Sequence, residues 1–268
     1  MKNNSLYLLI CLALVFIFLL PWVSNAGWII KMTTTRGNEM YRNILYIQGS
    51  RIKVVADEGW LIFDGLSHEI ILGNVEEKNF WKGNIGDLYR EIKRNNNDEA
   101  YKQSFSSYVV LEYILQQMLM GDKKGMINFY KEDTAVHCMR TAQMATISGI
   151  PVRKFIVNVH DTTKQEVWLG ENMIQKKEFY PQLVKAVSKI WHRGIRSNDF
   201  EYTKAYGLMK MMGFPLKTIT YNEDYKVVEV AQQVIEKRIE TSYFLIPTDF
   251  SPCSLPKLLR TYQNRNNQ

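Results

Sequence analysis

The segment from residue 27 to residue 81 alternates apolar and polar residues with the two-residue period of β-strands. In Arg51-Ile52-Lys53-Val54 the charged and the apolar side chains point to opposite faces, so one face is apolar. Turn-forming residues at 57–59 and 64–65 separate this part of the chain into short runs. Short strands joined by tight turns predict an antiparallel meander over this segment.

The rest of the chain changes to the spacing of helices and back to that of strands. Apolar residues three and four positions apart predict helices at 86–94, 99–120, 181–192 and 200–212. Alternating runs predict further strands at 135–138, 153–159, 165–169, 216–221, 227–235 and 242–246. Blocks of strands and blocks of helices, without strand–helix–strand units, predict an α+β fold with one antiparallel sheet and helices on one side.

The first 26 residues have the order of a secretory signal. A basic residue precedes an apolar run from Leu6 to Leu20, Pro21 breaks the run, and Ser24-Asn25-Ala26 offers small residues at the cleavage site. We expect cleavage after Ala26, a single domain over 27–259 and a polar tail over 260–268. The alternative is an uncleaved membrane anchor, which needs a helix of about 20 apolar residues.

The chain carries a formal net charge of +7, which falls to +6 when Lys2 leaves with the signal. A moderate positive charge attracts anionic surfaces such as lipid headgroups and is compatible with peripheral membrane contact. The basic residues are scattered, however, and they do not gather with aromatic residues on one predicted face. We therefore expect solvated charged faces and no binding of nucleic acid.

Two cysteines, Cys138 and Cys253, remain after the signal is removed. In an exported protein an even pair is compatible with a disulfide, which stabilises the fold by constraining the unfolded chain. Two buried free thiols are the equal alternative. A catalytic cysteine is not expected, because His137 precedes Cys138 directly and neighbours in a strand point to opposite faces.

The sequence has none of the common motifs of catalytic, phosphate-binding or metal sites. Gly-x-Ser-x-Gly, His-Glu-x-x-His, a Gly-rich phosphate loop and Cys-x-x-Cys are all absent. The four histidines are spread along the chain, and His160-Asp161 falls in a predicted hairpin turn. We therefore expect no catalytic residues, no metal and no cofactor, with an unfamiliar hydrolase site as the enzymatic alternative.

Several short motifs resemble those of one family of envelope proteins. They are the runs Tyr46–Val54, Ile62–Asp64, Phe80-Trp81, Ile147–Phe155, Glu166–Leu169 and Gly213–Lys217. Together they resemble uncharacterised relatives of the LolA-like lipoprotein-carrier superfamily, although Ile150-Pro151 stands where that family usually has a tyrosine. The resemblance implies a periplasmic antiparallel β half-barrel with helices packed on its concave side, and an apolar concave face that can hold acyl chains.

From this resemblance we expect an exported binding or carrier protein that holds a lipid, a lipoprotein acyl chain or another apolar small molecule in its groove. The alternative is an envelope protein-interaction or sensor module whose own helices fill the groove. Alternation alone gives the expected lining residues, which would serve equally well as ordinary core: Trp28, Ile30, Met32, Ile52, Val54, Phe155, Val157 and Val159.

Overall fold

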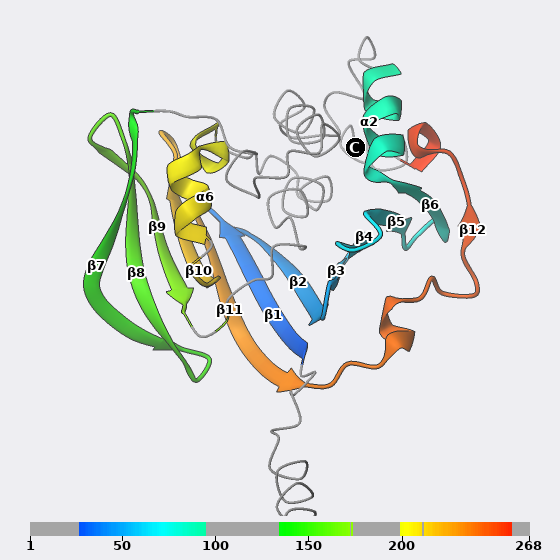
Figure 1. Ribbon diagram of the computed structural model, residues 1–268, viewed down its shortest axis with the longest axis horizontal. Coiled ribbons are helices and arrows are strands. Elements are labelled where there is room, and N and C mark those ends of the chain that lie inside the picture. Colours follow the sequence, from blue (N-terminus) through cyan, green and yellow to red (C-terminus); the bar gives the residue numbers. More distant parts are fainter. Residues whose placement is uncertain (1–26, 95–133, 172, 174–198, 211, 259–268) are drawn as a thin grey trace, which may run out of the picture.

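The structure is a computed structural model that describes residues 27–94, 134–171, 173, 199–210 and 212–258 (Figure 1). The signal at 1–26, the helices expected at 99–120 and 181–192, and the tail at 260–268 lie outside the described residues. Among the described residues, no helix has the length and apolar character needed to cross a membrane.

The described strands form a single 12-stranded sheet. Its strand order is β12-β6-β5-β4-β3-β2-β1-β11-β10-β9-β8-β7, and every pairing is antiparallel except that of β12 with β6. The bounds are β1 Gly27–Arg36, β2 Glu39–Gln48, β3 Arg51–Ala56, β4 Gly59–Asp64, β5 Glu69–Asn74, β6 Asn79–Asn84, β7 Val136–Ile147, β8 Ile150–Val159, β9 Thr162–Gly170, β10 Phe214–Tyr221, β11 Lys226–Lys237 and β12 Ser251–Pro252. The prediction of one large antiparallel sheet is therefore confirmed in its coarse form.

Two meanders meet in the middle of this sheet, where β1 pairs with β11. The edges are consequently β7 and the short β12. Figure 1 shows that the sheet is strongly curved, with β7–β9 and β5–β6 on opposite sides and α6 inside the curve. The hairpin turns follow from local chemistry: Ser148 and Gly149 have φ of 49° and 81°, and His160 and Asp161 have φ of 47° and 62°. Positive φ at both central residues is what a two-residue hairpin turn needs.

The inner face of the sheet carries a row of apolar side chains across β1 to β6. Residues directly opposite one another share a face, and the register aligns Ile30 with Leu45, Leu45 with Val54, Val54 with Leu61, and Leu61 with Leu72. Ile30 and Leu72 are 0% exposed and Leu61 is 1% exposed. This row is the centre of the largest hydrophobic cluster of the protein.

The outer face of β1 to β5 is also buried, because the chain after β11 crosses it (Figure 1). Ile239 and Phe244 of this C-terminal segment pack in one cluster with Ile29, Trp60 and Ile62 of the sheet. The strand predicted at 242–246 is wrong: residues Thr241–Phe244 form the 3-10 turn η5. Side chains of η5 contact the sheet in this cluster. In addition, Lys53 Nζ of β3 donates a hydrogen bond of 2.9 Å to the backbone carbonyl of Tyr243.

The predicted helix at 86–94 is confirmed as α2, Ile85–Arg94. Asn84 and Asp87 cap its start by reciprocal bonds of 2.9 Å, each side chain accepting from the other residue's backbone N–H. The helix predicted at 200–212 is divided into η4, Asp199–Tyr202, and α6, Lys204–Lys210. Thr203 separates them and donates its hydroxyl to the Phe200 carbonyl at 2.8 Å.

Candidate functional site

The structure places all the residues predicted to line a groove on the inner face. The register links Phe155 to Val167, Val167 to Thr218, Thr218 to Glu229 and Glu229 to Thr34. Because Thr34, Met32 and Ile30 alternate along β1, the β8 residues share the face of Ile30. The same reasoning through β2 includes the two β3 residues, so the full set on this face is Trp28, Ile30, Met32, Ile52, Val54, Phe155, Val157 and Val159.

These residues nevertheless belong to two separate clusters. Those of β1 and β3 pack in the largest cluster, whereas those of β8 pack in a second cluster with Tyr206 and Met209 of α6. Ile30 and Val157 are 0% exposed. The structure therefore brings the predicted residues to one face without joining them into one apolar surface.

Buried polar side chains lie on the inner face between the two clusters, at Thr34, Gln165, Thr218 and Thr220. Gln165 is 0% exposed; its amide donates to Thr220 Oγ1 at 2.9 Å and to Glu201 Oε1 at 3.2 Å. Tyr206 donates its hydroxyl to Gln165 Oε1 at 2.9 Å. We call Gln165, Glu201, Tyr206 and Thr220 the buried polar cluster. Because an acyl chain gains nothing from polar neighbours, this cluster interrupts the expected apolar groove.

A pocket of about 370 Å³ lies elsewhere, where the β2–β3 turn meets the C-terminal segment. Its lining is Gln48, Gly49, Ser50, Arg51, Asp64, Leu66, Ile239, Thr241 and Phe244. The Asp64 carboxylate already accepts bonds from Arg51 Nε at 3.1 Å, Ser50 Oγ at 2.9 Å and the Leu66 N–H at 2.9 Å. Burial acts to raise the pKa of Asp64, but these hydrogen bonds hold that pKa below its usual value. The pocket contains none of the predicted lining residues.

Cys138 and Cys253 are both free thiols in the structure. Cys138 lies on β7 at one edge of the sheet, and Cys253 follows β12 at the other edge. The two sulfurs are therefore not bridged in the structure. Burial raises the pKa of the Cys138 thiol to about 12, so this thiol is protonated at neutral pH and is a poor nucleophile.

The edge strand β7 is exposed over most of its length. It spans 12 residues, of which only Val136 is fully buried, and the side chains of Met139 and Met144 are 46% and 51% exposed. The sequence predicted a β block that starts near Met126, outside the described residues, and includes 135–138; the rest of β7 was not predicted, because a bulge interrupts the alternation further on. The turn residues Ser148-Gly149 are the signal that marks the far end of this strand.

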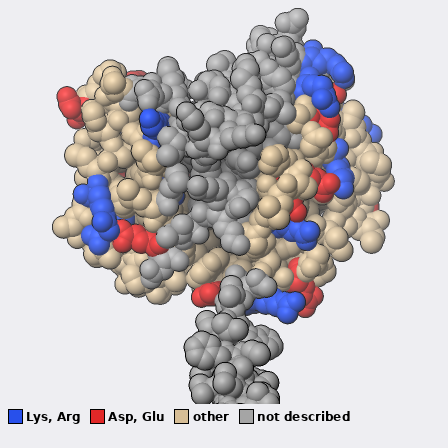
Figure 2. Space-filling model, in the orientation of Figure 1, with Lys and Arg blue, Asp and Glu red and all other residues tan. Residues whose placement is uncertain are grey.

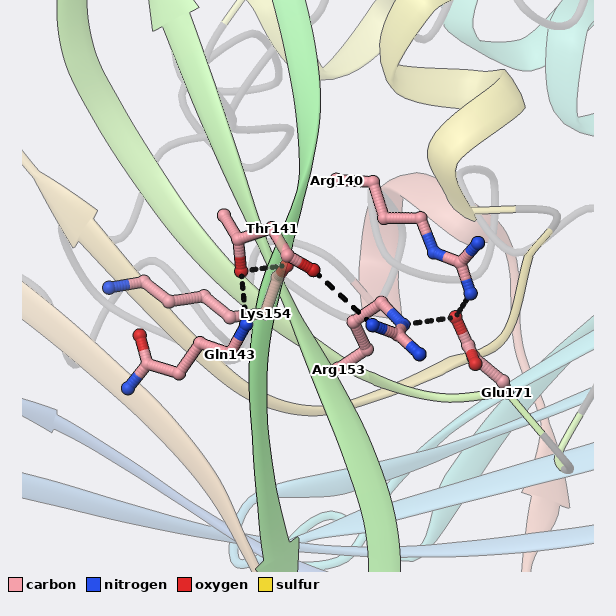
Figure 3. A network of polar contacts seen from close by, with 6 residues as sticks. All are labelled: Arg140, Thr141, Gln143, Arg153, Lys154 and Glu171. Atoms are coloured by element: carbon pink, nitrogen blue, oxygen red, sulfur yellow. Dashed lines mark hydrogen bonds and ion pairs between the residues drawn. The ribbon is translucent and has the colours of Figure 1, made fainter.

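The bulge in β7 is held by a network of side-chain contacts (Figure 3). Arg140 lies opposite Phe155 and Met144 opposite Arg153, so that residues 141–143 face Lys154 alone. Thr141 Oγ1 donates to the Lys154 carbonyl at 2.9 Å and accepts from the Gln143 N–H at 3.2 Å. A bulge of this kind ends regular pairing and turns side chains in a new direction.

Two arginines converge on one carboxylate beside this bulge (Figure 3). Arg140 Nη2 lies 2.6 Å and Arg153 Nε 3.0 Å from Oε1 of Glu171. Burial acts to raise the pKa of Glu171, but the hydrogen bonds and charges of the two guanidinium groups hold that pKa below its usual value. Glu171 is therefore ionised at neutral pH, and one negative charge faces two positive charges. We call Arg140, Arg153 and Glu171 the arginine pair and its carboxylate.

In the view of Figure 2, basic and acidic side chains lie next to one another at several places on the described surface. Within the described residues, no three histidine, cysteine, aspartate or glutamate side chains lie close enough together to hold a metal ion. The β7 edge combines an exposed edge strand with two arginines that share one carboxylate.

Comparison with known proteins gives structural likeness at low sequence identity. No known protein family matches the sequence, and no curated protein is similar enough to count as a relative. MucB in complex with MucA(peri) is 8% identical, with 86% of this chain and 57% of that chain covered and a TM-score of 0.39. In the MucA/MucB complex of Pseudomonas aeruginosa the matching chain is 7% identical, with 86% and 59% covered and a TM-score of 0.39. PNGF-II is 10% identical, with 88% and 34% covered and a TM-score of 0.37. The chain thus spans less than two thirds of the length of each of these chains.

Proposed function

We propose that this chain is an exported, non-enzymatic binding protein of the periplasm, and that its ligand is a segment of another protein that docks at the β7 edge. The observation that supports this proposal is the edge itself: among the described strands β7 has a neighbour on one side only, β8, and its side chains are mostly exposed. Natural sheets usually protect such edges, because unpaired N–H and C=O groups recruit further strands. The regular part of this exposed edge beyond the bulge, Met144–Ile147, is therefore a site for strand addition.

The direction of the free backbone groups follows from Pro151. Thr146 lies directly opposite Pro151, which has no N–H, so these two residues do not exchange backbone hydrogen bonds. The N–H and C=O groups of Thr146 consequently point away from β8, and those of Met144, two residues earlier, do the same. A docked segment has these groups available for a new ladder.

The inner face supports the same reading, since its apolar row is used as core. Leu61, Phe63 and Ile70 are each 1% exposed and pack in the largest cluster, whereas Phe155 and Val157 of β8 pack in the second cluster with Tyr206. Side chains that are buried as core are not available to a ligand, which favours the edges of the sheet as the place where a partner docks. This corresponds to the self-filled alternative for a LolA-like half-barrel.

An apolar ligand in the groove is the second candidate function. This candidate is favoured because all the predicted lining residues lie on one face. Two of them, Trp28 and Met32, are only partly buried. Native mass spectrometry of protein purified from its own envelope separates the candidates. Co-purifying lipid supports the carrier, and a clean protein mass with no extractable lipid removes it.

Photo-crosslinking in cells tests the proposed function directly. The full chain carries p-benzoylphenylalanine at Met139 or Met144, with Met40 and Leu66 as controls that are 59% and 74% exposed but lie away from β7. We expect one discrete crosslinked protein from the β7 positions and none from the controls. Crosslinks from the controls alone, or from no position, contradict the proposal.

A further inference from the structure

The chemistry of the β7 edge identifies the kind of segment that fits it; this inference rests on the proposed function. The hairpin from Val136 to Val159 contains Arg140, Arg153 and Lys154 and no aspartate or glutamate. Lys154 is paired with Glu166 of β9 at 2.9 Å. Arg140 and Arg153 share the single carboxylate of Glu171, so among the described residues one unit of positive charge is left beside the bulge.

The position of this charge matches a strand added to β7. Met144 and Arg153 lie directly opposite each other, so their side chains leave the sheet on the same face. A residue of an added strand that pairs with Met144 also projects on that face. It stands two strand spacings, about 10 Å, from Arg153, a span that a glutamate and an arginine side chain cover together. Arg140 projects from β7 itself, next to an added strand, and is 55% exposed; in the free protein its guanidinium group contacts Glu171.

We propose that β7 takes up an extended acidic segment of a partner protein, whose backbone pairs with Met144 and Thr146 and whose carboxylate binds the arginine pair. The exposed thioether of Met144 gives the neighbouring apolar side chain of that segment a soft contact surface. The bulge at 141–143 limits regular pairing to a few residues on either side, so affinity depends strongly on the carboxylate contact.

A second copy of this chain fits the edge less well. Pairing two β7 strands brings together two hairpins that each carry excess positive charge, and like charges across a ladder are destabilising. Charge complementarity therefore favours an acidic partner over self-association.

Fluorescence anisotropy with designed peptides tests this inference on the purified exported chain. The probe is a fluorescein-labelled eight-residue peptide that alternates glutamate with valine. One control peptide alternates lysine with valine, and another is the acidic peptide with methylated alternate backbone amides, which cannot form the ladder. We expect the acidic peptide alone to bind, and its binding to weaken in 0.5 M salt because exposed charges are screened.

Two variants separate the carboxylate contact from the backbone contact. Arg140→Gln is expected to weaken binding of the acidic peptide roughly ten-fold, the usual effect of losing a charged hydrogen bond. The control is Arg51→Gln, which removes a salt-bridged arginine of similar exposure (44%) on β3 and should leave peptide binding unchanged. Thr146→Pro removes an outward N–H and is tolerated at an edge, so it should weaken binding while the melting temperature stays close to that of the wild type.

The outcomes distinguish this inference from the function on which it rests. Equal binding of the acidic and basic peptides, or no effect of Arg140→Gln, overturns the acidic specificity and leaves docking at β7 in place if crosslinks form at Met144. A concentration-dependent dimer that Thr146→Pro dissolves overturns the inference in favour of a second copy. Absence of both peptide binding and crosslinks removes both proposals.

Discussion

Replacing Tyr206 by phenylalanine removes a single hydroxyl from the buried polar cluster. Tyr206 is 1% exposed, and its hydroxyl donates to Gln165 Oε1 at 2.9 Å. Gln165 is itself 0% exposed, so water does not replace the lost donor. Leaving a buried acceptor unsatisfied costs about 1–3 kcal/mol. For a chain of this size that corresponds to a decrease in Tm of roughly 2–12 °C.

The assay is urea unfolding followed by tryptophan fluorescence, with the midpoint and the slope fitted separately. We expect Tyr206→Phe to lower the midpoint at an unchanged slope. Tyr243→Phe is the matched control, because Tyr243 is 41% exposed and its change should stay within about 0.5 kcal/mol. An unchanged midpoint for Tyr206→Phe would refute the view that this cluster is a satisfied, water-free network.

Three further predictions concern the C-terminal segment, the pocket and the thiols. Phe244→Ala should destabilise the fold by about 3–5 kcal/mol in thermal melts, because Phe244 is 7% exposed and packs in the cluster on the outer face. The control is Leu245→Ala, which should have little effect because Leu245 is 60% exposed. The pKa of Asp64 is lowered in the fold, so its stabilising contribution is present above its ordinary value of 3.8 and is lost as the pH falls through the lower folded value. Asp64→Asn should therefore flatten the acid limb of the stability–pH curve, and an unchanged limb contradicts the assignment. Ellman's reagent in guanidinium, without reductant, should titrate both Cys138 and Cys253, and no titratable thiol would mean that they are bridged.

The elements that local patterns describe well are those with one buried face or a strong cap. Alternation in Arg51–Val54 correctly gave the apolar face of β3, and the apolar spacing at 86–94 gave α2. The continuous apolar run Trp60–Phe63 is the signal that β4 is buried on both faces. Its sequence does not say which segment covers the second face, because Phe244 reaches it from more than 180 residues away.

The candidate site shows what local patterns leave out. Alternation says which residues of one strand share a face, but only the register across β9, β10 and β11 places Phe155 on the face of Ile30. The buried polar cluster draws Gln165, Tyr206 and Thr220 from three elements that are 41 and 55 residues apart, so no local pattern announces it. At β7 the bulge at 141–143 breaks the two-residue period and hides most of the strand.

Amide hydrogen exchange along β7, resolved by NMR, tests docking at this edge most directly. In the free protein the outward N–H groups of Met144 and Thr146 should exchange quickly, while that of Ala145, which faces β8, should be protected. Addition of the acidic peptide should slow exchange at Met144 and Thr146 and leave Ala145 unchanged. Fast exchange at both positions with the peptide bound would contradict strand addition at β7.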